Sequence, residues 1–256
     1  MFLPKISVIT VCYNAEQHLE RTFQSVFSQN YPFIEYLVFD GKSTDNTITI
    51  IKKYEQKISF WQSEQDSGLY EAMNKALAKA SGEYLIFMNA GDTFFANDTL
   101  TKVFESKENA DIYYGEAQIL AAETFKVIGL RSEITPLSLP PQLTWRSLRW
   151  GMCVSHQAFI VKRSIATTYD LSYKYSADID WVIRCLKEAK HIVHTNLVIA
   201  NFILGGLSSQ KRKKSLEERY KILKKHYGFF SNIFNHCWIL LRGIFFILKK
   251  RKKYWD

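Results

Sequence analysis

The sequence predicts an α/β fold, with a mostly parallel sheet flanked by helices and a helical extension at the C-terminus. Between residues 6 and 88, four short runs of β-branched and aromatic residues alternate with stretches of helical periodicity. Strands separated by helices of this length form βαβ units, in which the strands are parallel. After residue 210 the chain becomes first basic and then apolar, with helical spacing. We therefore expect a domain over residues 1–205 and a helical tail over residues 206–256, with a boundary at Gly205-Gly206.

The predicted elements follow in order along the chain. Residues 6–12, ISVITVC, are typical of a buried strand, and Asn14 offers a cap for a helix over residues 19–27. Further strands are predicted at residues 34–39, 58–61 and 83–88, and further helices at residues 48–54 and 69–80. Beyond residue 110 the pattern predicts strands at residues 111–114, 125–130 and 191–198, a helix at 177–189 and a loop over 133–150.

The basic excess of the chain lies entirely in the tail. Its formal net charge is +9, yet residues 1–209 carry 20 Lys and Arg against 22 Asp and Glu. Residues 210–256 carry 14 against 3. We therefore expect no nucleic-acid binding by the main body and an anionic partner for the tail.

The four cysteines predict a reducing environment. They lie far apart without a CxxC pair, and Cys12 and Cys185 stand among apolar neighbours. The first residues do not resemble a secretory signal, because Lys5 interrupts a short run that leads straight into a strand. The expected location is the cytoplasm.

Polar residues follow three of the predicted strands. Asn14, Asp40 and Asp92 all fall at carboxyl ends, where open parallel sheets bind ligands. Asp40-Gly41 and Gly91-Asp92 would each also fit an ordinary turn, but two such carboxylates in one half-domain favour a site. No GxGxxG, GxxxxGK[ST], nucleophile elbow or HExxH motif occurs, which disfavours dinucleotide oxidoreductases and P-loop ATPases.

Several segments together resemble the large inverting glycosyltransferase family 2, which has the GT-A fold with a Rossmann-like nucleotide-binding sheet. They are SVITVCYN (residues 7–14), EYLVFDGKSTD (35–45), DSGLYEAMNK (66–75), SGEYLIFMNAGD (81–92), SHQ (155–157) and ADIDWVIR (177–184). The resemblance covers roughly residues 5–205, and it depends on the order and spacing of the segments.

The resemblance implies roles for particular residues. Asp178 stands at the position of the catalytic base, Asp40 at that of the acceptor for a uracil N3–H, and Asp92 at that of the ligand to Mn²⁺ or Mg²⁺. The implied nucleotide-sugar contacts are Thr10, Val11, Cys12, Tyr13, Asn14, Asp40, Gly41, Gly68, Asn74, Asn89, Ala90 and Gly91.

One metal-site segment departs from the family pattern, and three residues have open interpretations. Family members often show Asp-x-Asp where this chain has residues 89–92, NAGD, so only one carboxylate remains and weaker metal binding is expected. His156 either contacts the acceptor or leaving phosphate or is structural, Trp181 either stacks on a sugar or lies in the core, and Arg184 either binds phosphate or pairs with an acidic neighbour.

The tail predicts two helices. Ser215 and Glu218 form a capping-box pattern that opens the first helix, and Gly228 ends it. Residues 229–248 are 14 of 20 apolar, and their polar residues gather on one side of a helical wheel. With Arg242 and the basic residues 249–253, this pattern favours a helix lying on an anionic membrane surface over one docked on the domain or spanning the bilayer.

The combined expectation is a glycosyltransferase that is peripheral on the inner face of the cell membrane. It would move a sugar from a nucleoside diphosphate, UDP by resemblance, to a saccharide hydroxyl, with a lipid-linked acceptor in surface polysaccharide synthesis. The alternatives are a nucleotidyltransferase and a catalytically inactive, membrane-associated scaffold. The absence of a Gly-rich basic loop after the first strand disfavours the former, and the retention of Asp40, Asp92 and Asp178 disfavours the latter.

Overall fold

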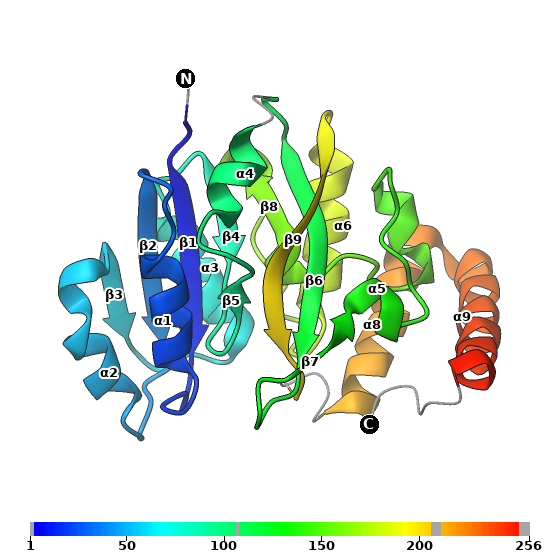
Figure 1. Cartoon of the computed structure of the whole chain (residues 1–256). Helices are drawn as coiled ribbons and strands as arrows, with labels where there is room; N and C mark the ends of the chain where they lie inside the picture. The colour runs from blue at the N-terminus through cyan, green and yellow to red at the C-terminus, as the bar shows by residue number, and fades with distance from the viewer. Residues whose placement is uncertain (1–2, 106–107, 206–210, 251–256) are drawn as a thin grey trace.

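The computed structural model describes residues 3–105, 108–205 and 211–250, and within them it forms one nine-stranded sheet (Figure 1). The strand order is β3-β2-β1-β4-β8-β6-β9-β5, and β7 pairs with β6 off this path. The strands of the first half are β1 (Ile6–Cys12), β2 (Ile34–Asp40), β3 (Phe60–Ser63) and β4 (Tyr84–Phe87). The others are β5 (Thr93–Phe94), β6 (Ile112–Leu120), β7 (Val127–Leu130), β8 (Phe159–Lys162) and β9 (Ile192–Ile203).

The first half of the sheet is parallel, as the βαβ pattern predicts. β1 pairs in parallel with β2 and β4, and β2 pairs in parallel with β3. Every residue of β1 is buried, which agrees with its mainly apolar sequence, and its two polar side chains, Ser7 and Thr10, are hydrogen bonded. The connecting helices are α1 (Leu19–Phe27), α2 (Thr47–Lys53) and α3 (Leu69–Lys79). The predicted α/β class is therefore confirmed.

The second half of the sheet is mixed. β8 runs antiparallel to both β4 and β6, β9 runs parallel to β6, and the short β5 and β7 pair antiparallel with their neighbours. Periodicity in the sequence missed β5, β8 and helix α4 (Thr99–Glu105), and it placed only the first part of β6. The predicted loop over residues 133–150 contains the end of α5 (Arg131–Ile134) and a 3₁₀ helix, Trp145–Trp150.

The core lies on both faces of the sheet because successive β1 residues point to opposite sides. Ile6 and Val8 pack with α1, α2 and α4, whereas Ile9 and Val11 pack with α3 and with α6 (Ala177–Glu188). The tail contributes to the second face, since Ile222 of α8 (Arg212–Tyr227) is fully buried there. The expected boundary at Gly205-Gly206 falls partly on residues 206–210, outside the described residues.

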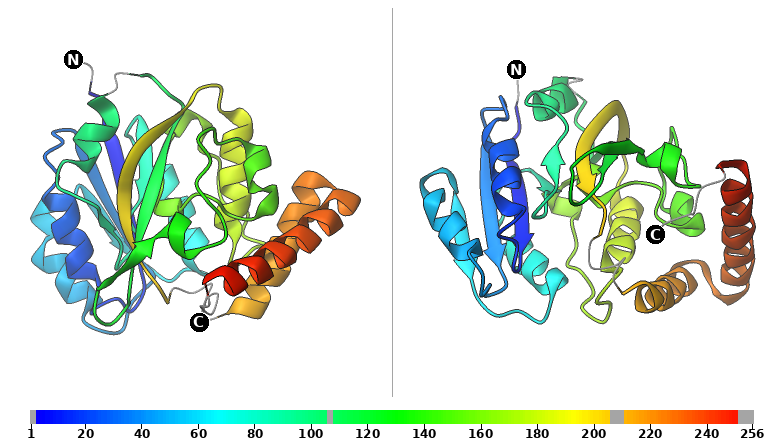
Figure 2. Two further views of the ribbon diagram at one scale, coloured as in Figure 1. Left: turned by 45° about the vertical axis from the view of Figure 1, so that its right-hand side comes forward. Right: turned by 60° about the horizontal axis from the view of Figure 1, so that its bottom comes forward.

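The two C-terminal helices, α8 and α9 (Phe229–Lys250), lie on the side of the molecule away from β1, β2 and β3 (Figures 1 and 2). α8 begins at Arg212 rather than Ser215, and Glu218 bonds to residues outside α8 instead of closing a capping box. Gly228 separates the helices with φ of 83°, a conformation that glycine adopts readily. Of the basic run at residues 249–253, residues 251–253 lie outside the described residues.

Candidate active site

The loops after β1 and β2 meet at the carboxyl edge of the sheet. Asn14 adopts a left-handed conformation with φ of 47°, and its side-chain oxygen accepts a hydrogen bond from Thr44 N at 2.9 Å. The Asn14 backbone N–H donates to Ser43 Oγ at 2.8 Å. Asn14 therefore joins the two strand-end loops, and α1 begins further on, at Leu19, so Asn14 does not cap that helix.

Asp40, at the end of β2, fixes the turn that follows it. Its carboxylate accepts hydrogen bonds from Ser43 N at 2.9 Å and from Ser63 Oγ at 2.7 Å, and the Ser43 hydroxyl also donates to it. The side chain is nearly enclosed, with 2% of its residue surface exposed. Cys12 lies behind it, and burial together with Asp40 raises the pKa of the Cys12 thiol. Both residues shape the edge of the site from within.

A second carboxylate, Asp66, lies across Gly41 and was not predicted as a site residue. A Cβ atom on Gly41 would lie 2.9 Å from Asp66 Oδ2, so the absence of a side chain at Gly41 gives Asp66 its place. Asp66 Oδ1 accepts a hydrogen bond from Gly68 N, and burial raises the pKa of Asp66. The Asp-Ser-Gly turn before α3, with Gly68 at φ of 136°, is the sequence signal for this position.

The segment Thr10–Asn14 presents few side chains to a ligand. Thr10 Oγ1 is buried, donates to Met88 O at 2.6 Å and is hydrogen bonded to Tyr36 Oη. Val11 is buried in the core. Tyr13 is 64% exposed, so within this segment the surfaces offered to a ligand are Tyr13, Asn14 and the backbone.

The segment after β4 carries one carboxylate, Asp92, in an enclosed position. Asp92 is 5% exposed, and its two oxygens accept hydrogen bonds from Gln157 Nε2 at 2.7 Å and Ile203 N at 3.3 Å. Burial raises the pKa of Asp92 to about 7. Asn89 Oδ1 is buried without a hydrogen-bond partner in the described structure. Among the described residues, no three His, Cys, Asp or Glu side chains gather as metal ligands. In the structure the Asp92 oxygens are bonded to Gln157 and Ile203, and the role of Asp92 as a metal ligand stays a prediction.

Beside this segment, Arg21 lies near the carboxyl edge. Its Nη1 donates to the carbonyl of Gly91 at 2.7 Å. Ala90 is partly buried against the core on the face of α1. A Cβ atom on Gly91 would come within 3.1 Å of Ile203, and its φ is 101°, so glycine suits this position on both counts.

Asp178 lies in the first turn of α6, facing the start of α3. Tyr70 Oη donates to Asp178 Oδ1 at 3.2 Å, and the Tyr70 ring stacks on Tyr169. Burial raises the pKa of Asp178, and Arg219 of α8 opposes the rise. A small pocket beside Tyr70 is lined by residues 67–71, Leu171, Tyr173 and Lys174. Asp178 is thus a partly buried carboxylate that is bonded to Tyr70, one of the residues that line this pocket.

Three other predicted residues hold the structure around this carboxylate. Asn74 exchanges two hydrogen bonds with the Tyr169 backbone, at 2.7 and 3.0 Å, so both ends of its amide are engaged. Trp181 is 1% exposed and donates to Thr167 O, which settles the core interpretation over sugar stacking. Arg184 bonds to Asp180 Oδ2 at 2.7 Å and to Thr168 O, as the interpretation of an acidic neighbour predicts.

His156 is also structural. Its Nε2 is hydrogen bonded to Tyr169 Oη at 2.7 Å, and its ring stacks on Phe87. Burial lowers the pKa of His156 to about 4, so the ring is neutral at physiological pH. It supports Tyr169, which in turn packs on Tyr70.

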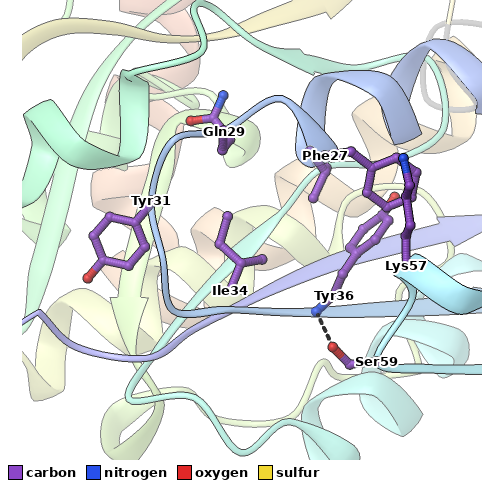
Figure 3. A pocket seen from close by; sticks show the side chains of 8 residues that line it. Phe27, Gln29, Tyr31, Ile34, Tyr36, Lys57 and Ser59 are labelled. Atoms are coloured by element: carbon purple, nitrogen blue, oxygen red, sulfur yellow. Dashed lines mark hydrogen bonds between the residues drawn. The ribbon is translucent and has the colours of Figure 1, made fainter.

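A larger pocket of about 190 Å³ lies at the opposite edge of the sheet (Figure 3). Its lining includes Ile34 and Tyr36 at the amino end of β2, with Lys57 and Ser59 from the segment before β3. The catalytic candidates lie at the carboxyl ends of the strands, so this pocket is separate from them.

The family model for glycosyl transferase family 2 matches residues 7–167. The chain belongs to this family. It is therefore a glycosyltransferase, and the expected resemblance is confirmed.

Two relatives match most of this glycosyltransferase. An uncharacterized glycosyltransferase of Mycobacterium tuberculosis is 28% identical over 250 residues, covering 94% of this chain and 91% of that protein. A PGL/p-HBAD biosynthesis glycosyltransferase of Mycobacterium bovis is 28% identical over 220 residues, covering 82% and 81%. A putative teichuronic acid biosynthesis glycosyltransferase of Bacillus subtilis is 39% identical over 105 residues, which cover 40% of this chain and 41% of that one.

Solved structures confirm the GT-A-type fold of this glycosyltransferase. Staphylococcus aureus TarS in complex with UDP superposes with a TM-score of 0.64 at 19% identity, over 86% of this chain. The chain spans 64% of the length of that TarS structure. A mannosyltransferase of Pyrobaculum calidifontis in complex with GDP-Man and Mn²⁺ gives 0.62 at 16% identity, over 86% of this chain and 64% of that one.

Proposed function

We propose that this glycosyltransferase transfers a sugar from UDP to a saccharide hydroxyl with inversion at the anomeric carbon, using Asp178 as the base. The acceptor oxygen attacks the anomeric carbon opposite the leaving group, and the bond from that carbon to the diphosphate oxygen breaks. The acceptor proton passes to an Asp178 oxygen, and UDP leaves with the bonding electrons. The observation that carries the proposal is the partly buried Asp178 carboxylate, which is bonded to Tyr70 in the lining of a small pocket.

The nucleotide end of the donor is proposed to lie over the joined loops after β1 and β2. Tyr13, Asn14, Gly41 and Gly68 border this edge, and Asp66 offers a carboxylate oxygen to a base N–H. Asp40 supports the edge from beneath through its bonds to Ser43 and Ser63. The TarS complex with UDP supports UDP as the nucleotide, because TarS shares the fold.

Asn89, Ala90 and Gly91 are proposed to border the diphosphate. A divalent cation would supply charge compensation for the departing diphosphate, as metals do in phosphate chemistry. Because Asp92 is enclosed and each of its oxygens already accepts a hydrogen bond, the cation is proposed to be held by the diphosphate and not by Asp92, and the proposed proton transfer does not depend on it.

The acceptor is proposed to be a lipid-linked saccharide in polysaccharide or glycolipid synthesis, reached from the cytoplasmic face of a membrane. The described part of the chain has one helix, Phe229–Lys249, that by length and composition alone could cross a membrane. In α9, Asn232 and Asn235 are buried against the protein, and Arg242 donates to Trp150 O at 2.7 Å. The polar side therefore faces the domain, which favours a helix lying on the membrane surface.

The outer side of α9 completes this membrane surface. Its apolar side chains are exposed: Phe229, Phe230, Ile233, Phe234, Trp238, Leu240, Leu241, Ile244, Phe245, Ile247 and Leu248. The preceding helix α8, which packs on α9, carries exposed cations: Arg212, Lys213, Lys214, Lys221 and Lys224. An apolar face flanked by cations matches an anionic lipid surface.

The proposed reaction is tested by incubating the purified protein with a panel of α-linked UDP- and GDP-sugars and a lipid-pyrophosphate saccharide. The product is examined by NMR for the configuration of the new linkage. We expect transfer from one UDP-sugar and a β-linked product. A product with retained α configuration would contradict the inverting mechanism, and transfer from GDP-sugars alone would contradict the proposed nucleotide.

A further inference from the structure

One side chain of α8 organises the segment that enters α6, the helix that carries Asp178. Glu218 Oε1 accepts a hydrogen bond from Lys174 N at 2.8 Å, and Oε2 accepts bonds from Tyr175 N at 2.8 Å and Ser176 N at 2.9 Å. Three consecutive backbone N–H groups thus converge on one carboxylate. Hydrogen bonds to a charged acceptor are stronger than those between neutral groups.

The entry to α6 has no side-chain cap of its own. Ser176 occupies the cap position, where a serine commonly accepts a hydrogen bond from the first turn of the helix. Here it makes no such bond, and its buried hydroxyl is hydrogen bonded to Ser215 Oγ at 2.8 Å. The backbone two residues before Asp178 is therefore held by Ser215 and Glu218, both on α8.

A second contact fixes the same turn of α6 from its other side. Asp180 is fully buried and accepts hydrogen bonds from Lys225 Nζ at 3.1 Å and His226 Nε2 at 2.8 Å, in addition to Arg184. Although burial opposes ionisation, the bonds from His226 and Arg184 hold the pKa of Asp180 well below its usual range. α8 therefore contacts the first turn of α6 at two places, through Glu218 and through Lys225 and His226.

We propose that Glu218 is a positioning residue, which holds the start of α6 so that the Asp178 carboxylate meets the acceptor hydroxyl. The inference rests on the proposed role of Asp178. Displacement of a reacting group by about 1 Å can reduce a rate about 100-fold. The donor edge is built from the loops after β1, β2, β3 and β4, and the described bonds of Glu218 go to none of these loops, so Glu218 is expected to act on the proton-accepting step and not on nucleotide binding.

The test compares Glu218→Ala, Glu218→Gln and Asp178→Asn in the full chain. We measure kcat at saturating concentration of the UDP-sugar that the wild type uses, UDP affinity by calorimetry, and Tm. Glu218→Ala is expected to lower kcat at least about tenfold while UDP affinity stays within about twofold. Glu218→Gln keeps one acceptor oxygen and is expected to recover part of the kcat. In the Asp178→Asn background, Glu218→Ala should add no further loss.

Two matched controls separate positioning from stability. Glu217→Ala removes the neighbouring exposed carboxylate of α8 and should leave kcat and Tm unchanged. Tyr31→Phe removes a buried hydrogen bond to Pro4 O at the opposite edge of the sheet, and should lower Tm without lowering kcat.

The outcomes distinguish the two proposals. If Asp178→Asn keeps full activity, the proposed base is wrong, and the positioning role falls with it. If Asp178→Asn is inactive but Glu218→Ala keeps wild-type kcat, the base stands and the positioning role is overturned. Loss of UDP affinity together with kcat in Glu218→Ala would also overturn it. If Glu218→Ala does not fold, Glu218→Gln decides the question. A lowered kcat with unchanged UDP affinity supports the positioning role, and a wild-type kcat or a loss of UDP affinity overturns it.

Discussion

At the scale of single residues, the carboxylates of this site divide by whether their oxygens are already bonded. Asp40 and Asp92 are nearly fully buried, and both oxygens of each accept hydrogen bonds from the protein. Asp66 and Asp178 are only partly buried, and Asp178 is bonded to Tyr70, which lines the small pocket. We therefore propose that the first pair builds the site and that the second pair contacts substrates.

Substitution of Asp92 tests this division. Asp92→Asn should lower Tm, because its single acceptor oxygen can meet only one of the two donors, Gln157 Nε2 and Ile203 N, and the unmatched contact costs about 1–3 kcal/mol. Both proteins are then treated with a chelator and titrated with Mn²⁺. The Mn²⁺ concentration that gives half-maximal activity should be the same for Asp92→Asn and the wild type. Asp98→Asn, which alters only an exposed pair with Lys102, serves as the control. A large rise in the Mn²⁺ requirement at unchanged Tm would show instead that Asp92 binds the metal.

His156 makes the stability depend on pH. The pKa of this buried ring is about 4 in the fold and near 6.5 when unfolded, so below pH 6.5 the unfolded chain takes up a proton that the folded protein does not. The free energy of unfolding is therefore unaffected by His156 titration above pH 6.5, and it decreases as the pH falls from 6.5 toward 4. The difference between the two pKa values of His156 corresponds to about 3 kcal/mol of unfolding free energy.

His156→Gln, which does not titrate, should therefore lose less stability than the wild type between pH 7 and pH 4.5 in urea unfolding. The exposed His191→Gln should follow the wild-type curve. Parallel curves for His156→Gln and the wild type would mean that His156 is not neutral in the fold.

At the scale of elements, α9 turns its polar side inward and its apolar side outward. The periodicity of residues 229–248 predicted both faces, but it left open which of them meets the domain. The contact of Arg242 with Trp150, and the burial of Asn232 and Asn235, show that the polar side does. The sequence left docking on the domain and binding to a membrane as alternatives. In the structure the polar side of α9 docks on the domain, and its apolar side remains exposed for a membrane.

The membrane proposal predicts a loss of vesicle binding when the outer face of α9 is made polar. Phe230 and Phe234 are 78% and 76% exposed. Changing both to Ser should weaken binding to phosphatidylglycerol vesicles more than about tenfold in a sedimentation assay, since burial of one Phe contributes about 1.5–3 kcal/mol. Phe33→Ser with Phe95→Ser, also exposed but outside the tail, is the matched control. Equal binding by both double variants would contradict the proposed surface.

The elements also show what the sequence could not predict. β1 and β2 were found because they are rich in β-branched and aromatic residues, whereas β5 has only two residues and β8 directly follows a 3₁₀ helix, without turn residues to mark its start. The capping-box pattern at Ser215 and Glu218 was misread because local sequence cannot reveal a partner more than 40 residues away, such as Ser176. Asp66 was missed because its place depends on its contact with Gly41, which only the fold brings about.

At the scale of the whole molecule, the fold brings Asp178 and the loops proposed to bind the nucleotide to one region from distant parts of the chain. Tyr70 at the start of α3 bonds to Asp178 at the start of α6, and α8 holds α6 in place from the C-terminal side. The helix next to α8 carries the proposed membrane face. Substrate from a membrane and donor from solution would therefore meet at a base that both halves of the chain position.

The measurement that tests the central claim most directly is the rate of sugar transfer by Asp178→Asn at saturating donor, with UDP affinity measured in parallel. Removal of a general base that acts in the transition state should lower the rate about 10²–10⁴-fold and leave UDP affinity unchanged. Asp98→Asn, the same chemical change at an exposed position, should transfer at the wild-type rate. Transfer by Asp178→Asn within a few-fold of the wild type would contradict the account.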